Sequence, residues 1–207
     1  MDLLHELNRK QLGQIRSAYE LAENSHYDQP HAQQTAFLSL RLFDELNPLH
    51  ELGSVERFWL LAAAILHDAG IATEGSHSHH KTALFMILNV RSLKFSEKER
   101  LLIGSIARYH RKSLPSIRHD HFAALSSDEK RSVSILSGIL RVADGLDFTH
   151  NQRISDLDCK IDLRKIRIDC KVSRPPAKLE RLRAMEKSIL LSEILHRDIR
   201  MTLHSIK

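Results

Sequence analysis

Five places along the chain carry side chains of the kinds that bind metal ions in proteins. In chain order they are His31, the adjacent pair His67 and Asp68, then His80, His110 and Asp144. The pair directly follows residues 58–66, the most apolar run of the sequence. An ionised carboxylate beside such a run is costly unless a cation or a hydrogen-bond donor compensates it. Imidazole nitrogen and carboxylate oxygen together suit a divalent transition-metal ion, which can activate water for hydrolysis.

Basic side chains close to these positions suggest what such a site could act on. Arg111 and Lys112 follow His110 directly, and Arg141 lies one helical turn before Asp144. Three or four ligands from separate helices, with one position left for water, make a catalytic rather than a purely structural metal site. Cations beside it would suit phosphate chemistry. Each residue also has a structural alternative, because single histidines often only pack and Asp144 could simply pair with Arg141.

The apolar pattern predicts that helices carry these residues. Apolar side chains recur at helical spacing over about residues 3–24, 30–46, 55–69, 79–90, 96–109 and 126–146. Glutamate follows Ser96 and Ser126 three residues later, which is the capping-box spacing, and Ser54 could cap the third helix. The fold class predicted for this part is therefore mainly α.

From residue 151 the pattern changes to strict alternation, which predicts two antiparallel strands with one buried face. Placing Leu163 opposite Ile166 sets apolar residues against apolar ones and charges against their opposites. This register puts the only two cysteines, Cys159 and Cys170, side by side, and we expect them to be reduced thiols. A helix over about 177–196 and a short strand around 199–203 complete a small C-terminal α+β unit.

Charge divides the chain at the same point. Residues 1–150 hold 17 basic and 18 acidic side chains, and residues 151–207 hold 14 and 8, so the last quarter supplies the net charge of +5. We predict a helical metal-binding domain over 1–150 and a small basic α+β subdomain over 151–207. The basic tail is either a solvated face or a surface for a phosphate-rich partner. No apolar run approaches the roughly 20 residues of a spanning helix and no secretory signal is visible, so we expect a soluble cytoplasmic protein.

The order of these residues resembles the HD superfamily of metal-dependent phosphohydrolases. It is most similar to the HD-type C-terminal region of the exopolyphosphatase and guanosine pentaphosphate phosphatase family. The similarity runs from about residue 25 to the end, through His31-Ala-Gln-Gln, Ala63-Ala-Ile-Leu-His-Asp-Ala-Gly70, His80-Lys81, Tyr109-His-Arg-Lys112 and Ile139-Leu-Arg-Val-Ala-Asp-Gly-Leu-Asp147. It implies an HD-type helical bundle whose metal ligands are His31, His67, Asp68, His110 and Asp144.

The remaining histidine of the family pattern corresponds best to His80, with His79 as the neighbouring alternative. Two positions depart from the pattern. Thr82 stands where the family commonly has a second histidine, and Ile71 stands where some HD hydrolases have lysine. The number of metal ions and the identity of a general acid therefore stay open.

We predict from this a metal-dependent phosphohydrolase that acts on a nucleotide or another phosphate ester. The expected cofactor is a divalent ion, with Mn²⁺, Fe²⁺, Mg²⁺, Zn²⁺ and Ni²⁺ as candidates. Asp68 would orient the attacking water, and Arg111, Lys112 or Arg141 would neutralise charge on the phosphoryl group. In long family members, hydrolysis of polyphosphate or pentaphosphate belongs to amino-terminal actin-like domains. No glycine-rich phosphate loops are visible here, so that activity is not expected.

The alternative is a non-catalytic regulatory or assembly module that binds polyphosphate, nucleotide or a partner enzyme. The expected partner in either case is a phosphate-containing small molecule, with polyphosphate as one candidate. A homodimer through the first helix or the basic tail is compatible with the sequence. We expect no membrane partner, and nucleic acid is disfavoured because no zinc-finger spacing or aromatic stacking platform accompanies the basic tail.

Overall fold

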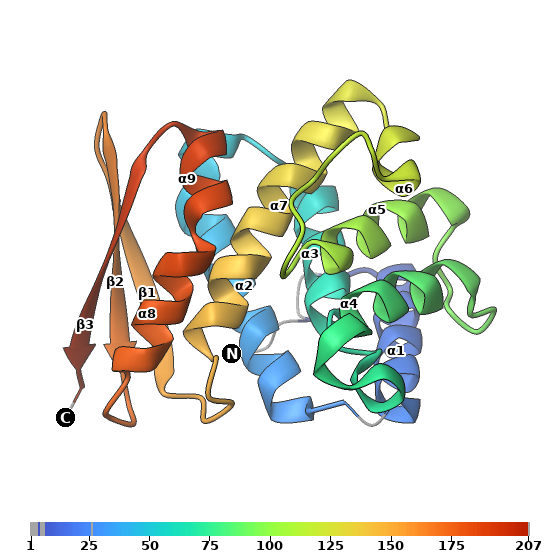
Figure 1. Ribbon diagram of the computed structural model, residues 1–207, viewed down its shortest axis with the longest axis horizontal. Coiled ribbons are helices and arrows are strands. Elements are labelled where there is room, and N and C mark those ends of the chain that lie inside the picture. Colours follow the sequence, from blue (N-terminus) through green and yellow to red (C-terminus); the bar gives the residue numbers. More distant parts are fainter. Residues whose placement is uncertain (1–3, 5–6, 26, 207) are drawn as a thin grey trace.

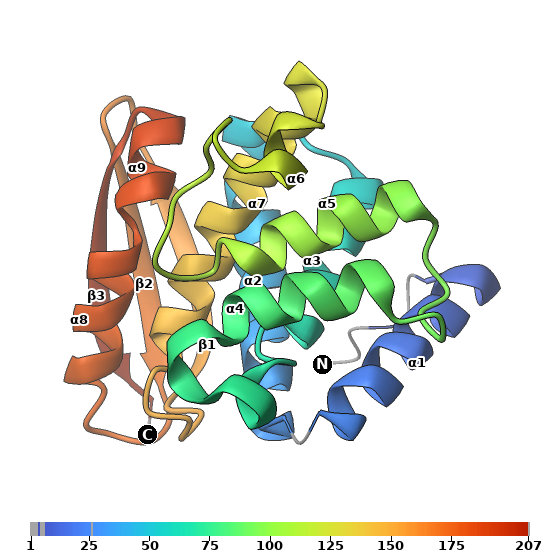
Figure 2. The same ribbon diagram turned by 45° about the vertical axis from the view of Figure 1, so that its right-hand side comes forward.

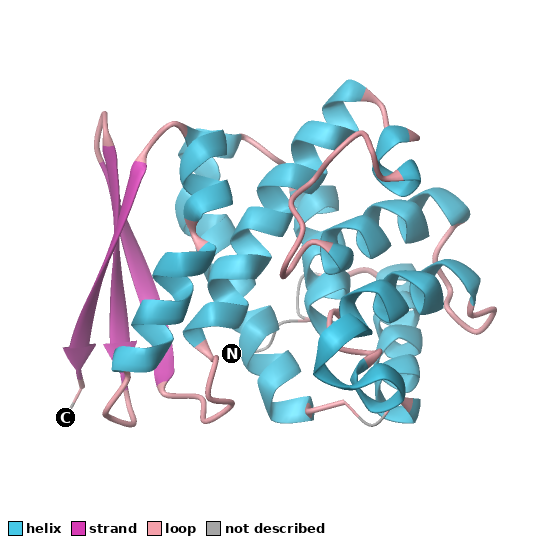
Figure 3. Cartoon of the chain, in the orientation of Figure 1, coloured by secondary structure: helices cyan, strands magenta, loops and turns pink. Residues whose placement is uncertain are grey.

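The computed structural model describes residues 4, 7–25 and 27–206, with the backbone alone described for residues 71–77. Helices dominate, and a three-stranded sheet lies at one end beside the C-terminal helices (Figures 1 and 3). The predicted class, mainly α with a C-terminal α+β unit, is confirmed. The elements are α1 (Arg9–Asn24), α2 (Gln29–His50), α3 (Ser54–Leu66), α4 (Ile71–Asn89), α5 (Glu97–Arg108), α6 (Asp120–Ala123), α7 (Ser127–Leu146), β1 (Ile154–Ile161), β2 (Lys165–Val172), α8 (Lys178–Lys187), α9 (Ile189–Leu195) and β3 (Asp198–Ser205).

Helix α3 is the centre of the helical body. Every residue from 60 to 66 is at most 1% exposed, because the helix is apolar on all sides and packs against α1, α2, α5 and α7. Helices α4 and α5 run side by side next to it (Figure 2). The end of α3 therefore delivers the residues that follow, His67 and Asp68, into the interior of the protein.

Local signals located most helix starts. The capping boxes at Ser96 and Ser126 are present as predicted, with each serine accepting from the backbone N–H of the glutamate three residues later. The third helix begins one residue earlier than predicted, so Ser54 is its first residue and Gly53 is the cap. Helix α4 begins at Ile71, whereas the predicted start was near residue 79. The prediction missed the first two turns because they lack regular apolar spacing. The predicted helix over 177–196 is divided at Ser188 into α8 and α9.

The sheet has the order β1-β2-β3, with β1 antiparallel and β3 parallel to β2. The parallel neighbour is reached through α8 and α9, since adjacent parallel strands need a long crossover. The predicted third strand is therefore confirmed. One face of β2, formed by Ile166, Ile168, Cys170 and Val172, is buried.

The predicted hairpin register is wrong by two residues. Ile161 instead of Leu163 lies opposite Ile166, and Leu157 lies opposite Cys170, so the cysteines are not cross-strand partners. A shift of two residues keeps the same side chains on the buried face, which is why the hydrophobic pattern could not exclude it.

The turn explains the register. The carboxylate of Asp162 accepts from the backbone N–H groups of Arg164 and Lys165, both at 2.8 Å, which leaves Leu163 and Arg164 at the tip. Lys171 then lies directly opposite Asp156, with its Nζ atom 3.0 Å from that carboxylate, and reaches Asp158 diagonally at 2.9 Å.

The C-terminal unit packs on the helical body through α2 and α7. Glu45 of α2 accepts from the backbone N–H of Cys159 on β1 at 2.8 Å. Helix α8 lies so close to α7 that a Cβ atom on Gly145 would stand 2.6 Å from the Cα atom of Ala184. This approach brings Lys187, the last residue of α8, to Asp144 of α7.

The division of the chain into two domains at residue 150 stays a prediction. Among the described residues, no helix is both long and apolar enough to cross a bilayer.

Candidate metal centre

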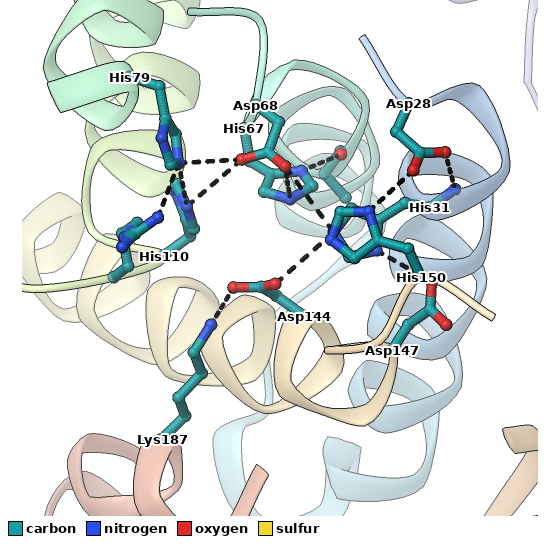
Figure 4. Close-up of polar contacts among 12 residues, drawn as sticks. Asp28, His31, His67, Asp68, His79, His110, Asp144, Asp147, His150 and Lys187 are labelled. Atoms are coloured by element: carbon teal, nitrogen blue, oxygen red, sulfur yellow. Dashed lines mark hydrogen bonds and ion pairs between the residues drawn. The ribbon is translucent and has the colours of Figure 1, made fainter. Parts of the chain in front are cut away.

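Five helices converge on one buried point, and each carries or precedes a histidine or a carboxylate there (Figure 4). His31 lies in the first turn of α2, and His67 and Asp68 follow α3. The others are His79 within α4, His110 just after α5, and Asp144 near the end of α7. All six are at most 8% exposed.

His67 and His110 are held in the same way. The Nδ1–H of His67 donates to the carbonyl of Ala64 and that of His110 to the carbonyl of Ala107, both at 2.8 Å. A carbonyl oxygen only accepts, so Nδ1 carries the proton and Nε2 keeps a free lone pair. In both cases the carbonyl lies three residues earlier at a helix end, where backbone acceptors lack intrahelical partners. Helix ends therefore fix the orientation of both rings.

His31 is oriented by a carboxylate. Its Nδ1–H donates to Asp147 at 2.9 Å, and Asp147 is fully buried. The backbone N–H of Gln152 donates to the other oxygen of Asp147 at 2.8 Å. The Nε2 atom of His31 then faces the carboxylates of Asp144 at 3.6 Å and Asp68 at 3.8 Å. A carboxylate behind a histidine whose second nitrogen points at other ligands is typical of metal sites.

These residues fit a divalent metal ion. Two overlapping groups, His31 with His67 and Asp144, and His67 with Asp68 and His110, each have ligand atoms within 4.8 Å of one another. The Nε2 atoms of His31 and His67 are buried and have no hydrogen-bond partner in the described part of the chain. Buried polar atoms are nearly always paired, so two unpartnered ring nitrogens beside ionised carboxylates indicate a cation as the missing partner.

Asp68 links all the histidines of the cluster. Its Oδ1 atom lies 3.1 Å from Nε2 of His79 and 3.6 Å from Nε2 of His110. Its Oδ2 atom lies 3.5 Å from Nε2 of His67 and 3.8 Å from Nε2 of His31. The single carboxylate is therefore shared between two histidine pairs.

Of the two adjacent histidines of α4, His79 is better placed than His80 to be a ligand, because it contacts the other residues of the cluster. His79 Nε2 is 3.3 Å from Nε2 of His110 and 3.4 Å from the Arg111 guanidinium. His80 lies behind it, with its ring centroid 6.4 Å from that of His110. Burial and the charge of Arg108 lower the pKa of His80 to about 4. The side chain of His77, a third nearby candidate, lies outside the described residues.

The charges around the site favour a cation. Burial alone would lower the pKa of His31, but the carboxylates of Asp144, Asp147 and Asp68 outweigh it and raise that pKa to about 10. Burial would raise the pKa of Asp144, but the charge of Lys187 and the neighbouring histidines hold it well below its ordinary value. The pKa of Asp68 is lowered too, because nearby histidines outweigh its burial. Both cluster carboxylates are thus ionised at neutral pH.

A cavity of about 450 Å³ opens onto the cluster. Its lining comprises Asp68, His79, His110, Arg111, Lys112, Asp144, Phe148, His150 and Lys187. Arg111 and Lys112 are thus at the cavity as predicted from their sequence positions. Arg141 is placed differently, because its guanidinium donates to the backbone carbonyl of Tyr109 at 3.0 Å and so supports the segment before His110.

Three residues of the site were not identified from the sequence. Asp147 follows Asp144 by three residues, directly after α7, so its spacing could have revealed it. His150 stacks on the ring of His31 at 3.7 Å, but it lies in an irregular loop with no periodic signal. Lys187 reaches Asp144 only through the packing of α8 on α7, which no local pattern encodes.

Comparison with known proteins places the chain in a family. Residues 14–187 match the model of domain III of the Ppx/GppA phosphatases. Since this match covers most of the chain, the protein belongs to the Ppx/GppA phosphatase family, as the sequence resemblance predicted. Over 102 residues it is 31% identical to the guanosine-5'-triphosphate,3'-diphosphate pyrophosphatase of Pseudoalteromonas translucida (strain TAC 125). The similarity covers 49% of this chain and 20% of that relative, so the chain spans only about one fifth of its length.

Proposed function

We propose that this protein is an HD-type, metal-dependent phosphohydrolase that acts on a nucleotide or another phosphate ester. The observation that carries the proposal is the pair of buried, unpartnered Nε2 atoms of His31 and His67 beside two ionised carboxylates. The residues that would hold a divalent ion are His31, His67, Asp68, His110 and Asp144, with His79 beside them.

When bound, a divalent ion there would supply Lewis-acid chemistry, lowering the pKa of water and polarising a phosphoryl oxygen. In the proposed mechanism Asp68 orients the attacking water, because its two oxygens face both histidine pairs. Arg111, Lys112 and Lys187 line the cavity and neutralise charge on the phosphoryl group. Asp147 keeps the proton of His31 on Nδ1 and so leaves Nε2 free to bind metal.

Membership of the family supports a phosphate-containing compound as the substrate. Members of a phosphatase family act on phosphate compounds, and the named relative is a pyrophosphatase of a guanosine phosphate. For this chain we propose phosphate-containing compounds of that kind, nucleotides and polyphosphate among them, as the molecules that enter the cavity.

The second candidate is a regulatory or assembly module that binds the same compounds without turnover. The observation that favours it is the extent of the similarity, which involves domain III of the family and about one fifth of the length of the pyrophosphatase.

Metal content and phosphate release, measured on the same preparations, test both candidates. The wild type is compared with Asp68→Ala and with His204→Ala, an exposed histidine on β3 far from the cluster in sequence. We expect close to stoichiometric Mn²⁺ by elemental analysis in the wild type and in His204→Ala, and its loss in Asp68→Ala. Phosphate release from nucleotides should follow the same order.

The two failures are distinct. Metal binding without release from any nucleotide or from tripolyphosphate would favour the regulatory module. Absence of metal from the wild type after incubation with Mn²⁺, Fe²⁺ and Zn²⁺ would refute the metal centre itself.

A further inference from the structure

One residue that lines the cavity differs in chemical character from the others. Eight of its nine lining residues are charged or are histidines, and the ninth is Phe148, which is 39% exposed. An aromatic ring next to ionised carboxylates and ammonium groups gains nothing from them by hydrophobic burial. It does offer a flat, apolar face to whatever enters the cavity.

One face of the Phe148 ring packs against a guanidinium group. The guanidinium carbon of Arg183 on α8 lies over the ring, 4.8 Å from its centroid, in a cation–π arrangement. Arg183 in turn donates to Glu186 on the same helix at 2.8 Å. A side chain supported in this way is pre-organised, so a ligand that stacks on it loses little entropy in ordering it.

The chain connects this ring closely to the residues that would hold the metal ion and the phosphate. Phe148 follows Asp147, the residue that orients His31, and lies four residues after Asp144. Its support Arg183 and the cavity residue Lys187 are one turn apart on α8. The aromatic wall and the basic side chains are therefore parts of one framework, and the cavity of about 450 Å³ falls within the range that holds a small-molecule ligand.

We propose that Phe148 is a stacking platform for the base of a nucleotide whose phosphate lies at the metal centre. The site would thus select phosphate compounds that carry a planar ring over those, such as polyphosphate, that carry none. This inference rests on the proposed function for the position of the phosphate, and it narrows the substrate class of the same site.

The test compares two ligands that share three linked phosphates and differ in the base: guanosine triphosphate and tripolyphosphate. Dissociation constants are measured by calorimetry with Mn²⁺, and kcat and KM by phosphate release. The variants are Phe148→Leu, which keeps an apolar side chain without the ring, and Phe148→Trp, which keeps a flat ring. Phe85→Leu is the control, because Phe85 on α4 is 65% exposed and does not line the cavity.

We expect Phe148→Leu to weaken binding of guanosine triphosphate about tenfold, which is the usual size of a base–aromatic stacking contribution. The loss should fall on KM and leave kcat almost unchanged, since the ring does not touch the reacting atoms. Binding of tripolyphosphate should not change, Phe148→Trp should retain affinity for the nucleotide, and Phe85→Leu should behave as the wild type.

The outcomes separate this inference from the proposed function. Preference for the nucleotide, lost in Phe148→Leu, with no phosphate release from either compound would favour the regulatory module over the hydrolase and support the platform. Release from both compounds with equal kcat/KM, affected alike by Phe148→Leu, would refute the platform and support the hydrolase. Failure of the wild type to bind guanosine triphosphate more tightly than tripolyphosphate would also overturn the inference.

Discussion

Removal of the Lys187 ammonium should strengthen metal binding. Lys187 is in direct ionic contact with Asp144, a predicted ligand, and the two side chains are 21% and 12% exposed. At an effective dielectric constant of about 20, unit charges about 4 Å apart attract by about 4 kcal/mol. A divalent ion that binds Asp144 must compete with this contact and also experiences repulsion from the ammonium. Partial solvent exposure screens both effects, so we take about 1.4 kcal/mol as the net competition, which corresponds to about tenfold in affinity.

Calorimetric titration of metal-free protein with Mn²⁺ measures this effect. We expect Lys187→Met, which keeps the length of the side chain without its charge, to lower the dissociation constant for Mn²⁺ about tenfold. Lys178→Met is the matched control, since Lys178 is an exposed lysine at the start of the same helix. Thermal unfolding of the variants checks that α8 still packs on α7.

Inhibition by inorganic phosphate should change in the opposite direction. A lysine that neutralises phosphoryl charge contributes to phosphate binding, so Lys187→Met should raise the inhibition constant for phosphate while it lowers the dissociation constant for Mn²⁺. A purely structural lysine would not produce opposite shifts. If Lys187→Met binds Mn²⁺ no more tightly than the wild type, the competition argument is wrong.

Three further predictions concern other parts of the molecule. Asp147→Ala should weaken Mn²⁺ binding about 10- to 100-fold, because His31 then loses the carboxylate that fixes its tautomer; unchanged affinity in the same titration would contradict this role. Gly145→Ala should lower the free energy of unfolding by about 1–3 kcal/mol in urea titrations, since the added methyl group meets the backbone of α8, and full stability would show that the two helices can separate at little cost. His50 is fully buried, and burial lowers its pKa, so the unfolded chain binds a proton there first as the pH falls. The stability that His50 contributes is therefore complete above about pH 6.5 and declines below it, and the stability difference between wild type and His50→Gln should shrink between pH 7.5 and 5. A constant difference over that range would be inconsistent with the lowered pKa.

Much of the site could be predicted because its residues adjoin strong local signals. The run before His67 consists of apolar residues only, which predicts a helix that is buried on all sides at the centre of the protein. The residues that follow this helix then lie in the interior, where an ionised carboxylate such as Asp68 needs a cation or a hydrogen-bond donor. Capping boxes located the starts of α5 and α7, and with them the positions of His110 and Asp144.

The features that could not be predicted depend on contacts between distant segments or on an exact helix phase. The choice between His79 and His80 is a rotation of about 100° around α4, and the start of that helix had no apolar signal to fix its phase. The hairpin register was decided by the side chain of Asp162 in the turn, whereas the hydrophobic pattern is the same for registers two residues apart.

The candidate metal centre draws on both parts of the chain. The predicted ligands all precede residue 150, but the cation that contacts Asp144 and the guanidinium behind Phe148 both come from α8. They reach the site because Gly145 on α7 lets the backbone of Ala184 approach without a side chain between the helices. We infer that the glycine next to Asp144 thereby sets how near a positive charge can come to a predicted ligand carboxylate. The basic balance of the last quarter of the chain is therefore not only a solvated surface, since Lys187 contacts Asp144 inside the candidate site.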